Sequence, residues 1–258
     1  MTERPAIIMV HGFRGTHHGL QLIRDRLEDY EVIVPDLPGF GTQAPLSSHD
    51  LVSYVQWLHT FIVQKKFTQP PVLLGHSFGS IITAAYAATY PDSIATLILV
   101  NPIGAPALRG PQAGLTMLTV AYYWIGRQLP KKLATKWLSA RSIVKIMSIA
   151  MTTSKDPKVR AYVHKQHLLH FSQFASPTVV AQAFATSTKH DVRASAPSIF
   201  VPTLLIAGQK DMVTPLKKQR ALAALFANAR LIVIENVGHL THYETPDQVA
   251  DLIKKFIR

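Results

Sequence analysis

The chain of 258 residues contains no cysteine, which excludes disulfide bonds, thiolate nucleophiles and zinc sites built on thiolates. It also has no uninterrupted apolar run long enough to cross a bilayer, so a transmembrane protein is not expected. Residues 1–12 include Glu3, an apolar run of only five residues and no small-residue cleavage site, unlike a secretory signal. The absence of a membrane span and of a signal predicts a cytoplasmic protein.

Acidic residues are scarce in the middle of the chain. Residues 102–200 contain 13 Lys and Arg but only two acids, Asp156 and Asp191, so this segment holds +11 of the total charge of +12. The rest is nearly neutral, with 14 basic and 13 acidic residues. The pattern indicates a local basic surface rather than a chain that wraps polyanions, and no nucleic-acid partner is expected.

Outside this segment, short apolar runs alternate with amphipathic helical stretches. Six runs resemble buried strands: 6–10, 31–36, 72–75, 94–101, 203–208 and 229–235. Apolar strands separated by amphipathic helices predict an α/β fold with a doubly wound, mostly parallel sheet of about six strands. Ligands of such sheets bind at the carboxyl ends of the strands. Four chemically capable residues follow strands: His11, Ser77, Asp211 and His239.

Ser77 lies in "GHSFG" (75–79), between a strand-like run and a helix-like run. This context is typical of a nucleophile elbow, in which a sharp turn exposes the serine and the flanking glycines avoid a collision. A serine needs a histidine as base and a carboxylate to orient that base. Asp211 and His239 each follow a later strand, and the chain order Ser, Asp, His predicts a catalytic triad of these residues.

Five motifs in this order resemble those of the α/β-hydrolase superfamily: "HGFRG" (11–15), "DLPGFG" (36–41), "GHSFG" (75–79), "GQKDMVTP" (208–215) and "GHLTHYETP" (238–246). The resemblance implies that the first motif is the oxyanion loop and the last two hold the acid and the histidine of the triad. The backbone N–H groups of Phe13 and Phe78 are then the predicted oxyanion donors. Their aromatic rings favour an apolar acyl or aryl group in the substrate.

Other residues near these motifs were weighed for the same roles. Asp36 precedes a Pro-Gly turn and is interpreted as a loop cap. His76 adjoins the nucleophile but diverges from it across the elbow, and His242 follows the expected histidine by three residues. Asn101 occupies a strand end at which some members of the superfamily carry the acid, which strengthens Asp211.

The resemblance also implies a division into domains. Residues 1–102 and 196–258 are predicted to form the hydrolase core, without the two strands that many members place before the first motif. Residues 103–195 are predicted to form an inserted helical cap, with prolines at its entrance and exit.

One part of the predicted cap is amphipathic. A stripe at helical spacing consists of Leu133, Trp137, Ala140, Val144, Met147 and Met151, on one helix or a pair. Its basic border consists of Lys132, Lys136, Arg141 and Lys145. The stripe is interpreted as packing on the core, with contact to an anionic lipid surface or an anionic acyl substrate as the alternative. The spacing of His164, His167 and His170 invites a zinc site, but no carboxylate stands nearby and no metal or cofactor is predicted.

The sequence therefore predicts a serine hydrolase that cleaves a carboxylic ester or a similar acyl compound through an acyl-enzyme. Two alternatives stay open. Members of the superfamily use the same triad for C–C bond hydrolysis, perhydrolysis or lyase chemistry. A non-catalytic signalling protein that holds a small ligand under the cap is the alternative from another class.

Overall fold

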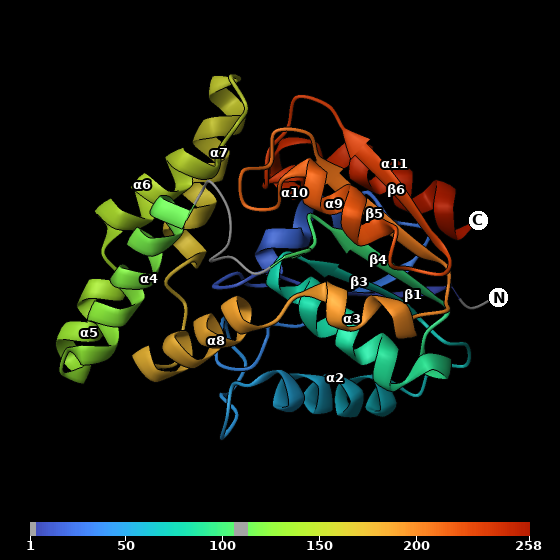
Figure 1. Cartoon of the computed structure of the whole chain (residues 1–258), viewed down its shortest axis with the longest axis horizontal. Coiled ribbons are helices and arrows are strands. Elements are labelled where there is room, and N and C mark those ends of the chain that lie inside the picture. The colour runs from blue at the N-terminus through green and yellow to red at the C-terminus, as the bar shows by residue number, and fades with distance from the viewer. Residues whose placement is uncertain (1–3, 106–112) are drawn as a thin grey trace.

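The computed structural model describes residues 4–105 and 113–258, which contain one parallel sheet of six strands (Figure 1). The strands are β1 (Ala6–Val10), β2 (Glu31–Ile33), β3 (Val72–His76), β4 (Thr96–Val100), β5 (Thr203–Gly208) and β6 (Ala229–Ile234). Their order is β2-β1-β3-β4-β5-β6, and every neighbouring pair is parallel. The predicted doubly wound sheet of about six strands is confirmed.

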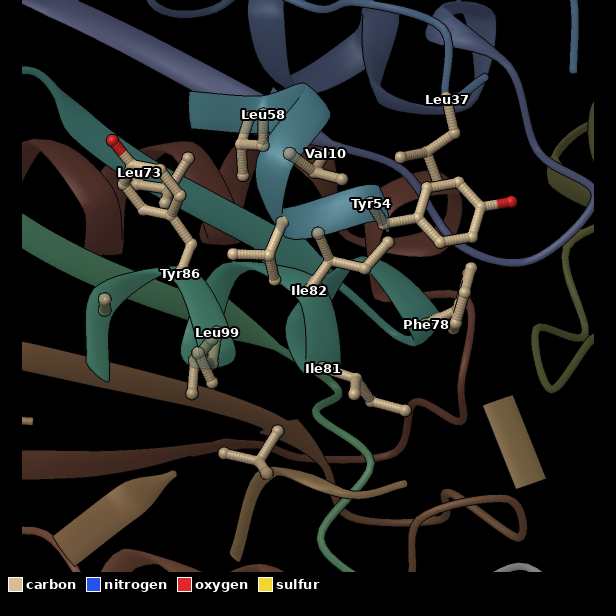
Figure 2. Close-up of a cluster of buried hydrophobic side chains, with 14 of the residues drawn as sticks. Val10, Leu37, Tyr54, Leu58, Leu73, Phe78, Ile81, Ile82, Tyr86 and Leu99 are labelled. Carbon is tan, nitrogen blue, oxygen red and sulfur yellow. The ribbon is translucent and has the colours of Figure 1, made fainter. Parts of the chain in front are cut away.

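Helices cover both faces of the sheet because successive strand residues point to opposite sides. Ile8 and Val10 of β1 pack in one cluster with α2 (Leu51–Lys65) and α3 (Phe78–Thr89). Figure 2 shows Val10 beside Leu58 of α2 and Ile82 of α3. Ile7 and Met9 pack in a second cluster. Further helices are η1 (His17–Leu20), α1 (Gln21–Arg24), η2 (Pro91–Ser93), η3 (Val192–Ala194), η4 (Ala196–Ser198), α9 (Leu216–Ala223), α10 (Thr241–Glu244) and α11 (Pro246–Ile257).

Five α-helices of the described chain lie between β4 and β5, ahead of η3 and η4, and we call these five the cap helices. They are α4 (Ala113–Gln128), α5 (Lys131–Leu138), α6 (Arg141–Met151), α7 (Pro157–His170) and α8 (Pro177–Lys189). Figure 1 shows α4 to α7 grouped to one side of the sheet, with α8 nearer to α3. The domain boundaries stay a prediction, and residues 106–112 of the predicted cap lie outside the described residues.

The predicted amphipathic stripe falls on a pair of helices, α5 and α6. The prediction that Leu133 belongs to its buried face is wrong. The chain leaves the helical conformation at Ser139 and Ala140, so the two helices set their buried faces independently. Leu133 is 54% exposed, whereas Ala134 and Leu138 are the buried residues of α5. Val144 of α6 is buried as expected. No helix among the described residues is long and apolar enough to cross a membrane.

Candidate active site

Ser77 lies at the sharp turn between β3 and α3, with a φ of +52°. This left-handed backbone conformation is rare for residues other than glycine and indicates strain. Gly75 and Gly79 are required because neighbouring atoms leave no room for a Cβ at either position. A Cβ at Gly75 would collide with the side chain of Thr83 and lie 2.6 Å from the carbonyl oxygen of Gly79. A Cβ at Gly79 would collide with the carbonyl oxygen of Val10. The local sequence therefore permits the turn that lifts Ser77 above the sheet.

The side chains of Ser77, His239 and Asp211 form a continuous chain of contacts. Ser77 Oγ lies 2.9 Å from His239 Nε2, and His239 Nδ1 lies 2.8 Å from Asp211 Oδ2. The histidine comes from the loop after β6 and the aspartate from the loop after β5. Both are buried. The three residues singled out by the sequence are thus brought together from distant parts of the chain.

The carboxylate of Asp211 accepts hydrogen bonds from several groups besides the histidine. Its Oδ1 accepts from the backbone N–H groups of Val213 and Thr214, at 2.7 and 2.9 Å. Its Oδ2 accepts from the Thr214 hydroxyl and from Asn101 Nδ2. Burial alone would raise the pKa of Asp211, but His239 and these hydrogen bonds hold it below its ordinary value. The group is therefore a carboxylate at neutral pH.

Asn101 is a site residue whose role the sequence did not reveal. It is fully buried at the end of β4, and its φ is +45°. Its Nδ2 donates to Asp211 Oδ2 at 2.8 Å, and its Oδ1 accepts from the Thr241 hydroxyl. Asparagine tolerates the left-handed conformation better than most residues. An asparagine directly after a strand was the available signal, but only the structure shows that its amide faces the carboxylate.

The other residues weighed for the triad, His76, His242 and Asp36, lie around it and make different contacts. The rings of His76 and His242 pack together at 4.1 Å, behind His239. Burial and the neighbouring histidines lower the pKa of His76 to about 3 and that of His242 well below its usual value. Both are therefore neutral at pH 7. Asp36 accepts hydrogen bonds from His17 and Thr42, as expected for a loop cap.

The loop after β1 runs directly beside the serine. A Cβ at Gly12 would lie 3.2 Å from Ser77 Cβ, so only glycine lets the loop come this close without a shift. Gly15 N–H donates to the carbonyl of Gly12 at 3.0 Å and closes a turn with Phe13 at its tip. Phe78 is the first residue of α3, where backbone N–H groups have no carbonyl partner within the helix. Both predicted oxyanion donors therefore flank Ser77.

A cavity of about 760 Å³ opens above Ser77 and His239. Its apolar lining residues include Phe13, Ile103, Tyr123, Met147, Met151 and Phe184. The Phe78 side chain, in contrast, is 1% exposed and packs on Tyr54 in the core, as Figure 2 shows, so its ring adds little to this wall. The described lining contains lysines but no aspartate or glutamate.

The histidines of α7 are engaged in other contacts. His164 and His167 both direct Nδ1 to the hydroxyl of Ser148, at 2.7 and 2.8 Å. His170 stacks on His18 of the core, with ring centroids 4.0 Å apart. Within residues 4–105 and 113–258, no three His, Asp or Glu side chains are grouped as metal ligands.

Comparison with known proteins identifies the class. The model of the alpha/beta hydrolase fold family matches residues 5–246, so the chain belongs to this family. Lipase 1 of Psychrobacter immobilis is 26% identical over 261 residues, covering 97% of this chain and 76% of the lipase. Monoacylglycerol lipase ABHD6 of Bos taurus is 24% identical over 274 residues, covering 99% and 76%.

A solved structure agrees with this assignment. A thermophilic esterase from Thermogutta terrifontis, with malate bound, matches with a TM-score of 0.79 at 25% identity, over 99% of this chain and 90% of that one. The predicted family, fold and class of enzyme, an ester-cleaving hydrolase, are therefore confirmed. The roles of individual residues stay predictions.

Proposed function

We propose that the chain hydrolyses carboxylic esters with Ser77 as nucleophile, His239 as general base and Asp211 as the group that orients the histidine. The observation that carries the proposal is the pair of contacts at 2.9 and 2.8 Å that joins the three side chains. A carboxylate on Nδ1 favours the histidine tautomer whose Nε2 accepts the serine proton. The predicted donors are Phe13, next to the loop residue Gly12 that approaches Ser77, and Phe78, at the start of α3, and their N–H groups would stabilise the oxyanion.

The reaction then proceeds in two balanced halves. Ser77 Oγ attacks the ester carbonyl while His239 takes its proton, and the N–H groups of Phe13 and Phe78 stabilise the oxyanion. The tetrahedral adduct collapses to the acyl-enzyme when the C–O bond breaks and His239 returns the proton to the alcohol. A water molecule, deprotonated by His239, then attacks the acyl carbonyl. The bond between Ser77 Oγ and the acyl carbon breaks, His239 returns the proton to Oγ, and the acid is released.

The cavity supports an apolar acyl or aryl group as the substrate part next to Ser77. Phe13, Tyr123 and Phe184 form an aromatic wall, with ring centroids 4.1 to 5.8 Å apart. Burial of apolar surface against such a wall contributes about 25 cal/mol per Å². The names of the relatives, lipases and an esterase, support the same substrate class.

Replacement of the nucleophile tests the proposal. Ser77→Ala is expected to abolish turnover of short p-nitrophenyl esters and labelling by a fluorophosphonate probe, with the thermal midpoint of unfolding retained. Most of the activity surviving in this variant would exclude Ser77 as nucleophile. An acyl-enzyme burst on esters but not on vinylogous diketones would separate ester from C–C bond hydrolysis. A protein that binds ligands without catalysis would give neither labelling nor turnover.

We further propose that the outer faces of α5 and α6 contact an anionic lipid surface. Three large apolar side chains are exposed there: Leu133 at 54%, Ile146 at 65% and Ile149 at 45%. The four basic residues predicted as a border, Lys132, Lys136, Arg141 and Lys145, are exposed beside them. Apolar side chains flanked by cations are typical of a surface that binds anionic membranes.

Vesicle binding tests this second proposal. Exchange of the four basic residues for glutamine is expected to abolish salt-sensitive sedimentation with phosphatidylglycerol vesicles. A matched control exchanges four cations outside the cap helices: Lys65, Lys66, Lys254 and Lys255. Equal loss in both variants would show that net charge alone, and not this surface, is responsible. The predicted cytoplasmic location is a separate proposal, which cell fractionation would test.

A further inference from the structure

Arg14 carries a positive charge in the interior of the protein and follows Phe13 directly. Its side chain is 1% exposed. The guanidinium donates from Nη2 to the carbonyl of Leu138 at 2.6 Å, from Nε to the carbonyl of Phe171 at 3.1 Å, and from Nη1 to the Tyr123 hydroxyl at 3.4 Å. In the described part of the chain, no ion pair with a carboxylate includes Arg14. A buried cation in such surroundings requires another source of negative potential.

The ends of two cap helices provide that potential. Leu138 is the last residue of α5, and Phe171 is the C-cap of α7. Carbonyls at the C-terminus of a helix lack intrahelical donors and carry the negative end of the helix dipole. The rings of Phe171 and Phe174 also lie near the guanidinium carbon, at 4.3 and 5.5 Å from their centroids. Since residues 93–155 contain no acid, α4, α5 and α6 could not have supplied a carboxylate.

The backbone of Arg14 belongs to the turn that places Phe13. The turn is closed by the hydrogen bond from Gly15 N–H to the carbonyl of Gly12, and Arg14 has a φ of +57° within it. This conformation favours glycine, so an arginine there indicates that its side chain serves a purpose. The Phe13 ring packs on Tyr123 and Phe184, which also belong to cap helices. Both tip residues of the turn are thus held from the cap.

We infer that Arg14 is a positioning residue, which fixes the Phe13 N–H for the oxyanion by tying the turn to the ends of α5 and α7. The inference rests on the proposed function, because this N–H has a catalytic role only if Ser77 attacks a carbonyl. Arg14 itself does not touch the reacting atoms. Its contribution is the rigidity of the turn, and displacement of a donor by about 1 Å can reduce a rate by about 10²-fold.

The test compares two variants of Arg14. Arg14→Met removes the charge but keeps an unbranched side chain, and Arg14→Lys keeps the charge but has fewer hydrogen-bond donors. The rate constant kcat is measured per active site, counted with a fluorophosphonate probe, on a short p-nitrophenyl ester. Inhibition by a trifluoromethyl ketone, whose adduct with Ser77 carries an oxyanion, gives the second readout. For Arg14→Met we expect kcat to fall about 10- to 100-fold and the inhibition constant to rise by a similar factor, with KM nearly unchanged. Arg14→Lys is expected to lie between this variant and the wild type.

The control is Thr186→Val, which removes the hydrogen bond from the Thr186 hydroxyl of α8 to the carbonyl of His49, another contact between cap and core. It is expected to leave kcat and the inhibition constant within about threefold of the wild type. A purely structural role for Arg14 predicts a lower thermal midpoint and fewer active sites, with kcat per site and inhibition unchanged, and this result would overturn the inference. If Arg14→Met does not fold, Arg14→Lys decides by the same two readouts. A wild type without turnover or labelling contradicts the proposed function as well, whereas an active wild type with unaffected Arg14 variants contradicts only the inference.

Discussion

The cavity has two walls, and their side chains are held in different ways. On the core wall, Ser77 and His239 belong to a hydrogen-bonded chain that ends in a buried carboxylate with five donors. On the cap wall, Phe184 packs on the rings of Phe13 and Tyr123, and Met147 lines the cavity, with no hydrogen-bonded chain like that of the triad among these described side chains. Directional bonds fix a geometry, whereas apolar contacts mainly require a similar volume. We infer that the core wall determines the reaction and the cap wall determines which acyl group fits.

The central sheet and the cap helices differ in how far their apolar side chains are covered, and the surface around the sheet also exposes Val52, Val63 and Phe200. The β1, β3, β4 and β5 strands of the core are buried almost throughout. The cap helices expose several large apolar side chains: Met117, Trp124, Ile125, Leu133, Ile146, Ile149 and Leu169. A covered sheet needs no partner, but an exposed apolar surface bordered by cations indicates one. The exposed apolar side chains of the cap helices therefore support the proposed contact with lipid.

The largest effect that can break this division is expected at Asp211. In Asp211→Asn, an amide replaces the carboxylate next to His239 Nδ1, so the histidine is held in the wrong tautomer and kcat should fall about 10⁴-fold. Steady-state kinetics on a p-nitrophenyl ester measure the effect. Asp191→Asn, which weakens the ion pair with Arg193 and the hydrogen bond from the Arg193 backbone N–H, serves as the control. A loss of less than about tenfold at Asp211 would mean that this carboxylate does not orient the base.

A smaller effect is expected at Asn101. Asn101→Ala removes the hydrogen bonds that the side chain donates to Asp211 and to the carbonyl of Gly238 and the one it accepts from Thr241. This loss should lower kcat about tenfold and cost about 1–3 kcal/mol of unfolding free energy. Asn101→Gly removes the same side chain but accepts the positive φ without strain. The two variants should lose the same activity while the glycine variant is the more stable. Full activity in Asn101→Gly would show that the amide does not support the carboxylate.

Ser77, His239 and Asn101 illustrate how much of the site could be predicted from the sequence. Ser77 was found because a glycine pair marks its sharp turn, and His239 because its segment resembles the histidine motif of the superfamily. The order of strand and helix in the core was predictable for the same reason, since each run has its own periodicity. Asn101 was read only as a missing acid, because its partner Asp211 is 110 residues away and adjacent only in the fold.

The cap could be predicted only in outline. A single helical period placed Leu133 on the buried stripe, but the break at Ser139 and Ala140 gave α5 its own orientation. The partners of Arg14 were equally hidden, because they are backbone carbonyls, which every residue has. Tertiary packing selects which face of a short helix is buried, and the local sequence does not determine it.

Acidification should affect stability mainly through the buried histidines of the core. Burial lowers the pKa of His76 to about 3; His239 and His242 pack against its ring, and His11 and Asp211 lie nearby. His76 therefore stays neutral in the folded state, whereas in the unfolded state it binds a proton below about pH 6.5. Stability therefore falls as the pH decreases from about 6.5 toward 3. His76→Asn should reduce this slope by about 1.4 kcal/mol per pH unit, measured by urea unfolding between pH 4.5 and 6.5. An unchanged slope would contradict the neutral state of His76.

A change in the cap wall should alter substrate choice with little effect on the chemistry. Met147→Ala enlarges the cavity and removes apolar contact, so KM for an octanoate ester should rise about three- to tenfold while kcat for an acetate ester is retained. Ile149→Ala on the same helix, where the side chain is 45% exposed, is the matched control and should change neither constant. A large loss of kcat on both esters in Met147→Ala would show that the cap also controls the chemistry.

The smallest effect is expected where the sequence and the structure disagree. Leu133 was predicted on the buried stripe but is 54% exposed, so Leu133→Gln should change the free energy of unfolding by no more than about 0.5 kcal/mol. Leu138 on the same helix is 2% exposed. Leu138→Ala should lower the free energy of unfolding by about 2–5 kcal/mol, because a cavity forms. Urea unfolding of both variants measures the contrast. A cost at Leu133 that matches the cost at Leu138 would restore the continuous stripe and contradict the break between α5 and α6.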